Sequence, residues 1–136
     1  MTNEKQLSLI PNDGGDILPP NTPSLLDFFA KSRRNEWLTG EALVVYVRSV
    51  ERNIENRRMK CFEISNVIAT QQGRGTFTAW LKYAEHQAKQ FNHSAIYVEN
   101  IINKWLMPFL ALKGYKIEQR LNEWETLAPD SMYKVL

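Results

Sequence analysis

The stretch ATQQGRGTFTAWLKYAEH, Ala69 to His86, places two glycines directly in front of a helical run. Phe77, Trp80, Leu81 and Ala84 follow one another at spacings of three and four residues. On a helix these positions share one face, so the run reads as amphipathic with its apolar side turned to a core. The stretch therefore predicts a tight turn that leads into a packed helix.

The segments on either side of this helix predict a strand–helix–strand unit. Met59–Ala69 is an apolar, β-branched run before the glycines, and Ala95–Glu99 is a short apolar run after the helix. Two strands joined in this way pair in parallel through a right-handed crossover. Asn103–Lys113 predicts a second amphipathic helix, with Gly114 as its C-cap. The fold class expected is α/β with a mixed sheet.

The N-terminal part carries weaker signals. Residues 1–22 are expected to be an extension or tether with a short strand at Gln6–Ile10, and residues 23–136 a single domain. Thr22 and Pro23 predict a helix start, and the helix is expected to reach Trp37, with Gly40 as its stop. The remaining elements expected are a strand over Leu43–Val50, a polar turn over Glu51–Arg58, and final strands over Tyr115–Leu121 and Met132–Leu136.

Composition narrows the class of protein. The 136 residues fit one domain, and 43% hydrophobic residues can build a core. The formal net charge of +2 is too small to argue for nucleic acid alone. The single cysteine, Cys61, excludes an internal disulfide and a cysteine-rich zinc site, and no metal site is expected. Without a long apolar run or a signal-peptide pattern, the sequence predicts a soluble cytoplasmic protein that does not bind membranes.

The glycine turn has features that are typical of an anion-binding site. Helix N-termini present unpaired N–H groups and a partial positive charge, and glycines let the backbone approach a ligand closely. Arg74 adds a positive charge next to them. The turn lacks the Lys-Ser/Thr pair of a P-loop, and Thr78 stands where the dinucleotide fingerprint has its third glycine. By itself, the glycine pair is equally compatible with an ordinary tight turn.

The wider spacing resembles a known motif. The run Gln72-Gly73-Arg74-Gly75-Thr76-Phe77 resembles the Q/R-x-x-G-x-G/A motif of the GCN5-related N-acetyltransferase (GNAT) superfamily, between a strand and a helix as in that family. Downstream, Val98, Asn103 and Lys113-Gly114-Tyr115 resemble its strand–Asn–helix–Gly-Phe/Tyr ending. The resemblance covers Leu43 to about Leu121 and identifies a short, divergent relative.

The resemblance implies a fold and a cofactor. The fold is a mixed sheet whose two central parallel strands splay apart, with helices on both faces. The cofactor is acetyl-CoA or another acyl-CoA. Its pantetheine arm would lie in the gap and pair with backbone near Val67, and Asn103 would help hold the cofactor or the second helix. The pyrophosphate would rest on the N–H groups of Gln72, Gly73, Arg74, Gly75, Thr76 and Phe77.

The sequence also departs from the family pattern. Phe77 stands where the motif has Gly or Ala, and we expect its side chain to point along the apolar face of the helix. The N-terminal half, which shapes the acceptor site in the family, is short. Leu110 occupies the position where many members carry a tyrosine that protonates the leaving thiolate, which leucine cannot do.

These implications predict an acyl-CoA-dependent N-acyltransferase acting on a primary amine of a protein or a small molecule. A general base would take the proton of the attacking amine. Glu63 is the first candidate and Glu99 the second, while Tyr97 and Tyr115 are the remaining candidate acids. The alternative for Glu63 is a structural carboxylate, paired with Arg48 across the hairpin.

Other interpretations stay open. The same fold could serve as a non-catalytic module that contacts a protein or nucleic acid, or as an enzyme acting on a nucleobase or tRNA amine. The basic hairpin is either a solvated face or a site for an acidic partner, and its residues are Arg48, Arg52, Arg57, Arg58 and Lys60. A homodimer is also left open. His86 and His93 are expected at the surface, and Cys61 in a buried strand position.

Overall fold

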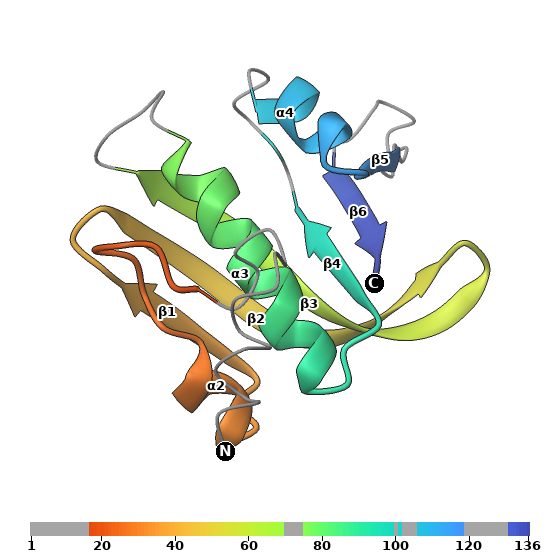
Figure 1. The fold of residues 1–136 in the computed structure, drawn as a ribbon. Coiled ribbons are helices and arrows are strands. Elements are labelled where there is room, and N and C mark those ends of the chain that lie inside the picture. Colours follow the sequence, from red (N-terminus) through yellow and green to blue (C-terminus); the bar gives the residue numbers. More distant parts are fainter. Residues whose placement is uncertain (1–16, 70–74, 100, 102–105, 119–130) are drawn as a thin grey trace, which may run out of the picture.

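The computed structural model describes residues 17–69, 75–99, 101, 106–118 and 131–136, which form one six-stranded mixed sheet and three helices (Figure 1). The strand order is β1-β2-β3-β4-β6-β5. The elements are α2 (Leu26–Ala30), β1 (Asn35–Thr39), β2 (Leu43–Ile54), β3 (Arg57–Ala69), α3 (Thr76–Gln90), β4 (Ala95–Val98), α4 (Leu106–Leu112), β5 (Lys116–Glu118) and β6 (Ser131–Val135). The expected mixed α/β class is confirmed.

The strand–helix–strand unit is present as expected. Helix α3 follows β3, and β4 then pairs with β3 in parallel, from Cys61 beside Ala95 to Ile64 beside Val98. The apolar positions of α3 are buried, Trp80 and Ala84 completely. The 3.6-residue periodicity was therefore a sufficient signal, because it coincides with a face that the sheet covers.

The hairpin of β2 and β3 is longer than expected. The two strands pair antiparallel from Leu43 to Ile54 and turn at Glu55 and Asn56, whose φ angles are 51° and 67°. Two central residues with positive φ are typical of the tight turns that fit the twist of a hairpin. The predicted polar turn over Glu51–Arg58 is wrong in extent, because most of its residues belong to the strands.

The predicted helix from Pro23 to Trp37 is also wrong. Helix α2 has only five residues, the chain turns at Ser32 with φ of 52°, and Trp37 lies in strand β1 opposite Tyr46. Thr22 is not a helix cap, since its hydroxyl donates to the Pro19 carbonyl at 2.6 Å. Pairing of β1 with the long strand β2 overrides the weak local preference for a longer helix.

The C-terminal elements agree with the expected order. Helix α4 lies within the predicted Asn103–Lys113, and Gly114 follows it with φ of +94°, a conformation that suits glycine. Strands β5 and β6 pair antiparallel, and β6 joins β4. The rest of these predicted segments, residues 103–105 and 119–121, lies outside the described residues, as does the predicted strand Gln6–Ile10.

The sheet has two unlike faces. The first face, under α3, is apolar and aromatic, and the described helices α2, α3 and α4 all contribute to its core cluster. Helices on the second face, which the resemblance implied, are not among the described elements. On this second face a smaller cluster gathers where the hairpin meets β4, formed by Ile54, Met59, Cys61, Ala95 and Tyr97. None of the described helices combines the length and apolar character needed to cross a membrane.

Candidate functional site

The central parallel strands β3 and β4 diverge after pairing over only four residues each. The last link joins the Glu99 N–H to the Ile64 carbonyl at 2.9 Å. Strand β3 then continues to Ala69 paired with β2 alone, while the chain leaves β4 in the direction of α4 (Figure 1). We call the position of Ile64 and Glu99 the splay point. It reproduces the parting of strands that the motif implied.

A β-bulge shapes β3 beside the splay point. Tyr46 pairs with Asn66 and Val47 with Ile64, so Ser65 is an extra residue opposite β2. A bulge re-aims the neighbouring side chains. The Ser65 hydroxyl lies 3.0 Å from Glu63 Oε2 and 3.2 Å from Glu99 Oε1. The bulge therefore joins the two carboxylates on the second face.

Helix α3 begins at a glycine. Gly75 is its N-cap at φ of 70°, and among the described residues no side chain caps this end. The first intrahelical bond runs from the Ala79 N–H to the Gly75 carbonyl at 3.0 Å. Phe77 is buried and packs near Trp80, with ring centroids 6.3 Å apart, so its side chain points to the core as expected. The N-terminus of α3 is thus suited to an anion.

The other predicted cofactor residues are placed unequally. Val67 pairs with Val45 of β2, and beyond the splay point no described strand pairs with the opposite edge of β3. Gln72, Gly73 and Arg74 lie outside the described residues, as does Asn103. Their roles stay predictions from the motif.

Glu63 sits in a buried ionic network. Its side chain is 0% exposed and lies between two guanidinium groups of β2. Arg48 donates to Glu63 Oε2 from Nε at 2.7 Å and from a second nitrogen, and Arg52 Nε donates to Oε1 at 2.7 Å. We call Arg48, Arg52, Glu63, Ser65 and Glu99 the second-face network.

The network sets the proton affinity of Glu63. Burial pushes the pKa of this carboxyl up, but the hydrogen bonds and charges of Arg48 and Arg52 outweigh it and hold the pKa below its usual value. A carboxylate held in this way is a weak proton acceptor. The geometry fits the alternative stated for Glu63, a carboxylate paired with Arg48 across the hairpin, and adds Arg52 as a second partner.

Glu99 is the more accessible carboxylate of the network. Its side chain is 19% exposed and follows directly after β4. Arg52 donates to Glu99 Oε2 at 3.0 Å, while an Arg48 nitrogen lies 3.7 Å from Oε1. Two guanidinium groups thus balance two carboxylates, and Arg48 is more exposed than Arg52 or Glu99, while Glu63 is fully buried.

The candidate acids are engaged elsewhere. The Tyr97 hydroxyl donates to Glu118 at 2.7 Å, and burial, reinforced by this carboxylate, raises its pKa. The Tyr115 hydroxyl donates to Glu85 at 2.7 Å, and burial raises its pKa well above the usual value. Leu110 is completely buried in the first-face core. Both tyrosine hydroxyls are thus hydrogen-bonded to carboxylates, and the leucine side chain has no proton to donate.

The basic hairpin does not form one surface. Arg48 and Arg52 turn to the internal carboxylates, whereas Arg57 and Arg58 are exposed and Arg58 pairs with Glu51 at 3.2 Å. An acidic partner could therefore meet Arg57 and Arg58 readily. It would meet Arg48 and Arg52 only through charges that are already balanced.

Cys61 and His93 are both buried, but the sequence predicted this only for Cys61. Cys61 is buried, as expected. His93 is buried as well, against the prediction of a surface position, because its ring packs on Phe29 at 5.0 Å between centroids and its Nε2 lies 2.8 Å from Ser49 Oγ. Burial, with the charge of Lys60, lowers the pKa of His93 to about 4.

Sequence reasoning missed Ser65 and Arg52 as members of the site. A usable signal existed, because Arg48, Val50 and Arg52 alternate on one face of a strand that pairs with Glu63. The paired register shows that both arginines can reach one carboxylate. The bulge that brings Ser65 into the network had no comparable signal.

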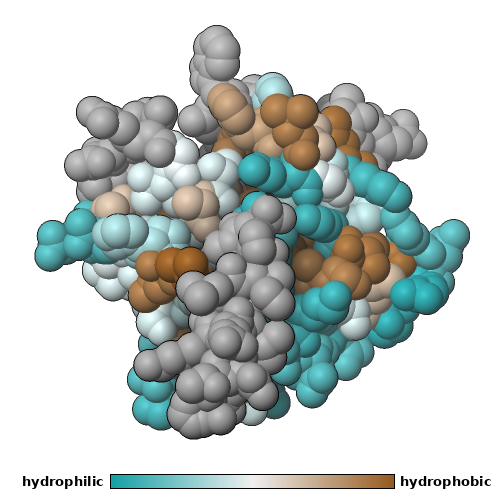
Figure 2. Space-filling model, viewed as in Figure 1, coloured by the Kyte–Doolittle hydropathy of each residue, from teal (hydrophilic) through white to brown (hydrophobic). Residues whose placement is uncertain are grey.

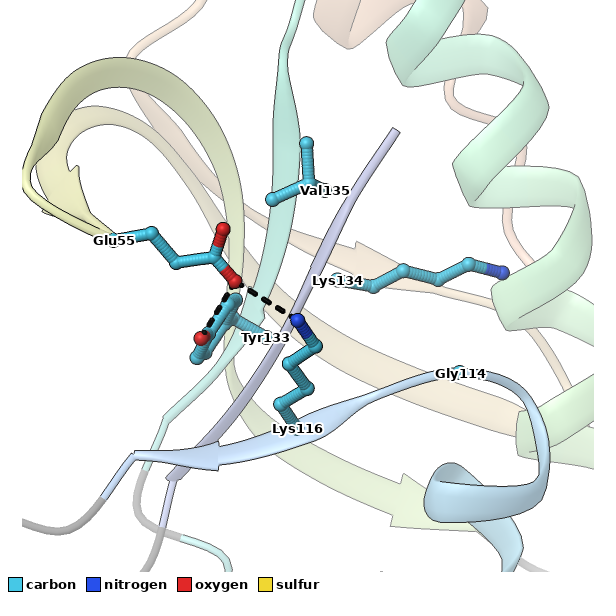
Figure 3. A pocket seen from close by; sticks show the side chains of 6 residues that line it. All are labelled: Glu55, Gly114, Lys116, Tyr133, Lys134 and Val135. Atoms are coloured by element: carbon cyan, nitrogen blue, oxygen red, sulfur yellow. Dashed lines mark hydrogen bonds and ion pairs between the residues drawn. The ribbon is translucent and has the colours of Figure 1, made fainter.

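A shallow pocket of about 180 Å³ lies at the other end of the sheet (Figure 3). Its lining residues are Glu55, Gly114, Lys116, Tyr133, Lys134 and Val135. Glu55 accepts hydrogen bonds from Lys116 at 3.1 Å and from Tyr133 at 3.0 Å, while Lys134 pairs with Glu85 of α3. Val135 pairs with Ala95, at the start of β4, so the pocket is remote from the splay point.

Comparison with known proteins identifies the fold. No protein-family model matches the sequence, and no curated protein matches it. An acetyltransferase of Bacillus subtilis in complex with CoA aligns over 84% of this chain and 89% of its own, with 16% identity and a TM-score of 0.53. An IAA acetyltransferase of Bacillus cereus aligns over 95% and 94%, with 16% identity and a TM-score of 0.51. The AtaT toxin, bound to the C-terminus of the antitoxin AtaR and acetyl-CoA, aligns over 82% and 72%, with 12% identity and a TM-score of 0.51. The chain therefore has the fold of the GNAT acetyltransferases.

Proposed function

We propose that this chain is a divergent member of the GNAT superfamily and an N-acyltransferase that uses acetyl-CoA or another acyl-CoA. The observation that carries the proposal is the splay point, from which β3 continues with one edge unpaired by any described strand, followed in the chain by the glycine start of α3. One end of this arrangement suits a pyrophosphate, and the unpaired edge of β3 suits an extended pantetheine arm. Structures of the same fold that hold CoA or acetyl-CoA support the assignment.

The residues present fit such a cofactor. The N–H groups of Gly75, Thr76 and Phe77 would meet the pyrophosphate, together with the preceding motif residues 72–74. Backbone of β3 near Val67 would hold the pantetheine, and Asn103 would support the second helix or the cofactor. When bound, the acyl-CoA supplies the thioester that is attacked.

The reaction places simple demands on the protein. The amine nitrogen attacks the thioester carbonyl carbon, a C–N bond forms, the C–S bond breaks, and the amine loses one proton. We assign the proton acceptor to Glu99, directly or through water, because it is the more exposed carboxylate at the splay point. Glu63 and Ser65 are positioning residues that hold Arg48 and Glu99. Since Leu110 supplies no acid, the thiolate departs without protonation from that position.

A second candidate function is a GNAT-fold binding module without chemistry. The observation that favours it is the pairing of both network carboxylates with arginines, combined with the packing of Leu110 in the core. Such a module would bind CoA or a protein partner but would release no thiol. The basic residues Arg57 and Arg58 would then be the natural contact for an acidic partner.

A matched pair of variants tests the cofactor site. Acetyl-CoA should raise the melting temperature of the wild-type protein, because a ligand that binds only the folded state stabilises it. Gly75→Asp should abolish this shift by placing a negative charge at the helix start. Gly75→Asn is nearly isosteric, also tolerates positive φ, and should keep most of the shift. Equal shifts in the two variants would contradict an anion site at Gly75.

Thiol release separates the enzyme from the binding module. The wild-type protein with acetyl-CoA and a panel of amines should release CoA thiol. Glu99→Gln should slow it by about 100-fold or more, the usual effect of losing a general base. If acetyl-CoA raises the melting temperature but no amine gives thiol release, the binding module is the better description.

A further inference from the structure

Among the described residues, those that are exposed at the splay point lie on one face of the sheet. The residues there that face α3, Ile64 and Val98, are buried in the first-face core. On the second face, Glu99 is partly exposed, Arg48 is 36% exposed and Asn66 is exposed. An acceptor that meets a thioester at the splay point therefore has to come from the second face.

An exposed apolar surface lies on that face next to the network. Trp37 of β1 and Tyr46 of β2 are directly opposite each other, with ring centroids 5.2 Å apart. Ile68 of β3 lies on the same face, diagonal to Tyr46. Trp37 is 51% exposed and Ile68 is 56% exposed. We call Trp37, Tyr46 and Ile68 the aromatic shelf. Exposed apolar side chains of this size that cluster beside polar residues are typical of binding surfaces.

The charges of the network select the protonation state of an acceptor. Both carboxylates are neutralised by guanidinium groups, and Arg48 is the residue between the shelf and Glu63. Each carboxylate of the network already has a guanidinium partner, so an ammonium group that approached along the shelf would find no unpaired network carboxylate to bind. The site therefore favours an amine that is already largely neutral.

This requirement separates two common classes of amine. The α-amino group of a peptide has a pKa of about 7.7–8.0, and a lysine side chain about 10.4. Near pH 7.5 the neutral fraction of the first is larger by a factor of roughly a few hundred. An α-amine therefore depends little on a strong proton acceptor, whereas a lysine ammonium or a polyamine would bring a charge that no unpaired carboxylate of the network neutralises.

We propose that the aromatic shelf binds the acceptor, and that the acceptor is the α-amino group of a peptide whose first residues are apolar. Trp37, Tyr46 and Ile68 hold the apolar side chains, and the amine reaches Glu99 in its neutral form. This inference rests on the proposed N-acyltransferase function and names the substrate class for the same site.

Three peptides of equal length test the substrate class. The first has a free α-amine, apolar residues at positions one and two, and no lysine. The second has the same free α-amine but arginines at those two positions. The third has a blocked N-terminus and one internal lysine. With acetyl-CoA at pH 7.5, we expect kcat/KM for the first peptide to exceed that for either of the others by at least about tenfold.

Matched surface variants test the place of binding. Trp37→Ala and Ile68→Ala should raise KM for the apolar peptide at least about fivefold and leave CoA affinity unchanged. Ile117→Ala, on β5 at the far edge of the sheet and 52% exposed, is the control for Ile68→Ala and should change neither. All three residues are exposed, so melting curves should stay close to wild type.

The outcomes separate this inference from the function on which it rests. Equal or faster turnover of the lysine peptide, of the arginine peptide or of a small amine overturns the substrate class but leaves an acyltransferase. Unchanged KM in both shelf variants overturns the shelf as the binding place. Absence of thiol release with every amine overturns the function and the inference together.

Discussion

The two faces of the sheet bury different kinds of side chain. On the first face, alternate residues of β3 such as Phe62 and Ile64 pack under α3 with aromatic partners. On the second face, the residues between them include Glu63, which is equally buried but surrounded by Arg48 and Arg52. The strand is the same, and only the side-chain parity differs.

The difference separates a face that stabilises the fold from a face that holds charged groups in place. An apolar core gains free energy from burial and tolerates no open position, whereas a buried ionic network gives little net stability and is sensitive to the loss of any partner. The first face therefore secures the positions of β3, β4 and α3. The second face keeps charged groups in fixed geometry at the splay point, where the proposed acyl transfer would use them. Exposed apolar surface does not follow this division between the two faces. Figure 2 shows apolar surface over α4, where Phe109 and Leu112 are exposed.

Breaking the second-face network should have the largest effect on stability. Glu63→Ala leaves Arg48 and Arg52 with only Glu99 as a partner, and we expect a loss of about 3–5 kcal/mol in the free energy of unfolding, measured with urea. The double variant Arg52→Met/Glu63→Met keeps Arg48 balanced by Glu99 and should recover most of that loss. If the double variant is as unstable as the sum of its two single changes, the network is not a charge-balanced unit.

Much of the fold could be predicted from the sequence, for identifiable reasons. Helix α3 and the parallel strand β4 follow from the spacing of Phe77, Trp80 and Ala84 and from the apolar run Ala95–Glu99. Strand β1 was mistaken for helix because its sequence, NEWLT, has no strong preference of its own and is fixed by pairing with β2. Strand β1 is therefore fixed by its hairpin partner and not by a pattern within its own five residues.

The candidate site divides in the same way. The Gly75 turn was predictable because a motif and a helix start coincide there. The role of Glu63 depended on whether arginines on a neighbouring strand share its face, and this required the register of β2 and β3. Four arginines that appear as one basic run in the sequence are separated by strand parity and position into an inner pair and an outer pair.

His93, which packs against the first-face core, should make stability depend on pH in a different range from the second-face network. Burial first, and the charge of Lys60 second, lower the pKa of His93 to about 4 in the folded state. The unfolded chain has a histidine pKa near 6.5, so it binds more protons between these two values and stability falls as the pH falls from about 6.5 to about 4. The expected loss is about 3 kcal/mol at most.

Urea unfolding at pH 7.5 and pH 5 measures this effect. His93→Gln can keep a hydrogen bond to Ser49 and should flatten the dependence over that interval. The carboxyl of Glu63, whose pKa is lowered, contributes stability that is lost only at lower pH, as the pH falls below its unfolded pKa of about 4.3. An unchanged slope between pH 6.5 and 5 in His93→Gln would show that another group dominates.

The smallest effect on stability is expected from the outer arginines, Arg57 and Arg58. Comparing one of them with an inner arginine tests whether the two pairs contribute differently to stability. Arg58 pairs with Glu51, but both side chains are more than 60% exposed, and such pairs contribute between zero and about 1 kcal/mol. Arg58→Gln should therefore change the free energy of unfolding by less than about 0.5 kcal/mol, with no dependence on the state of the second-face network.

Arg52→Gln is the matched comparison, the same substitution six residues earlier on the same hairpin. It removes a guanidinium that is hydrogen-bonded to both Glu63 and Glu99, and it should lower the free energy of unfolding several times more. Equal costs for the two substitutions would mean that burial does not distinguish the inner arginines from the outer ones. A larger cost for Arg52→Gln alone would show that the position of an arginine along this hairpin decides whether it belongs to the site or to the surface.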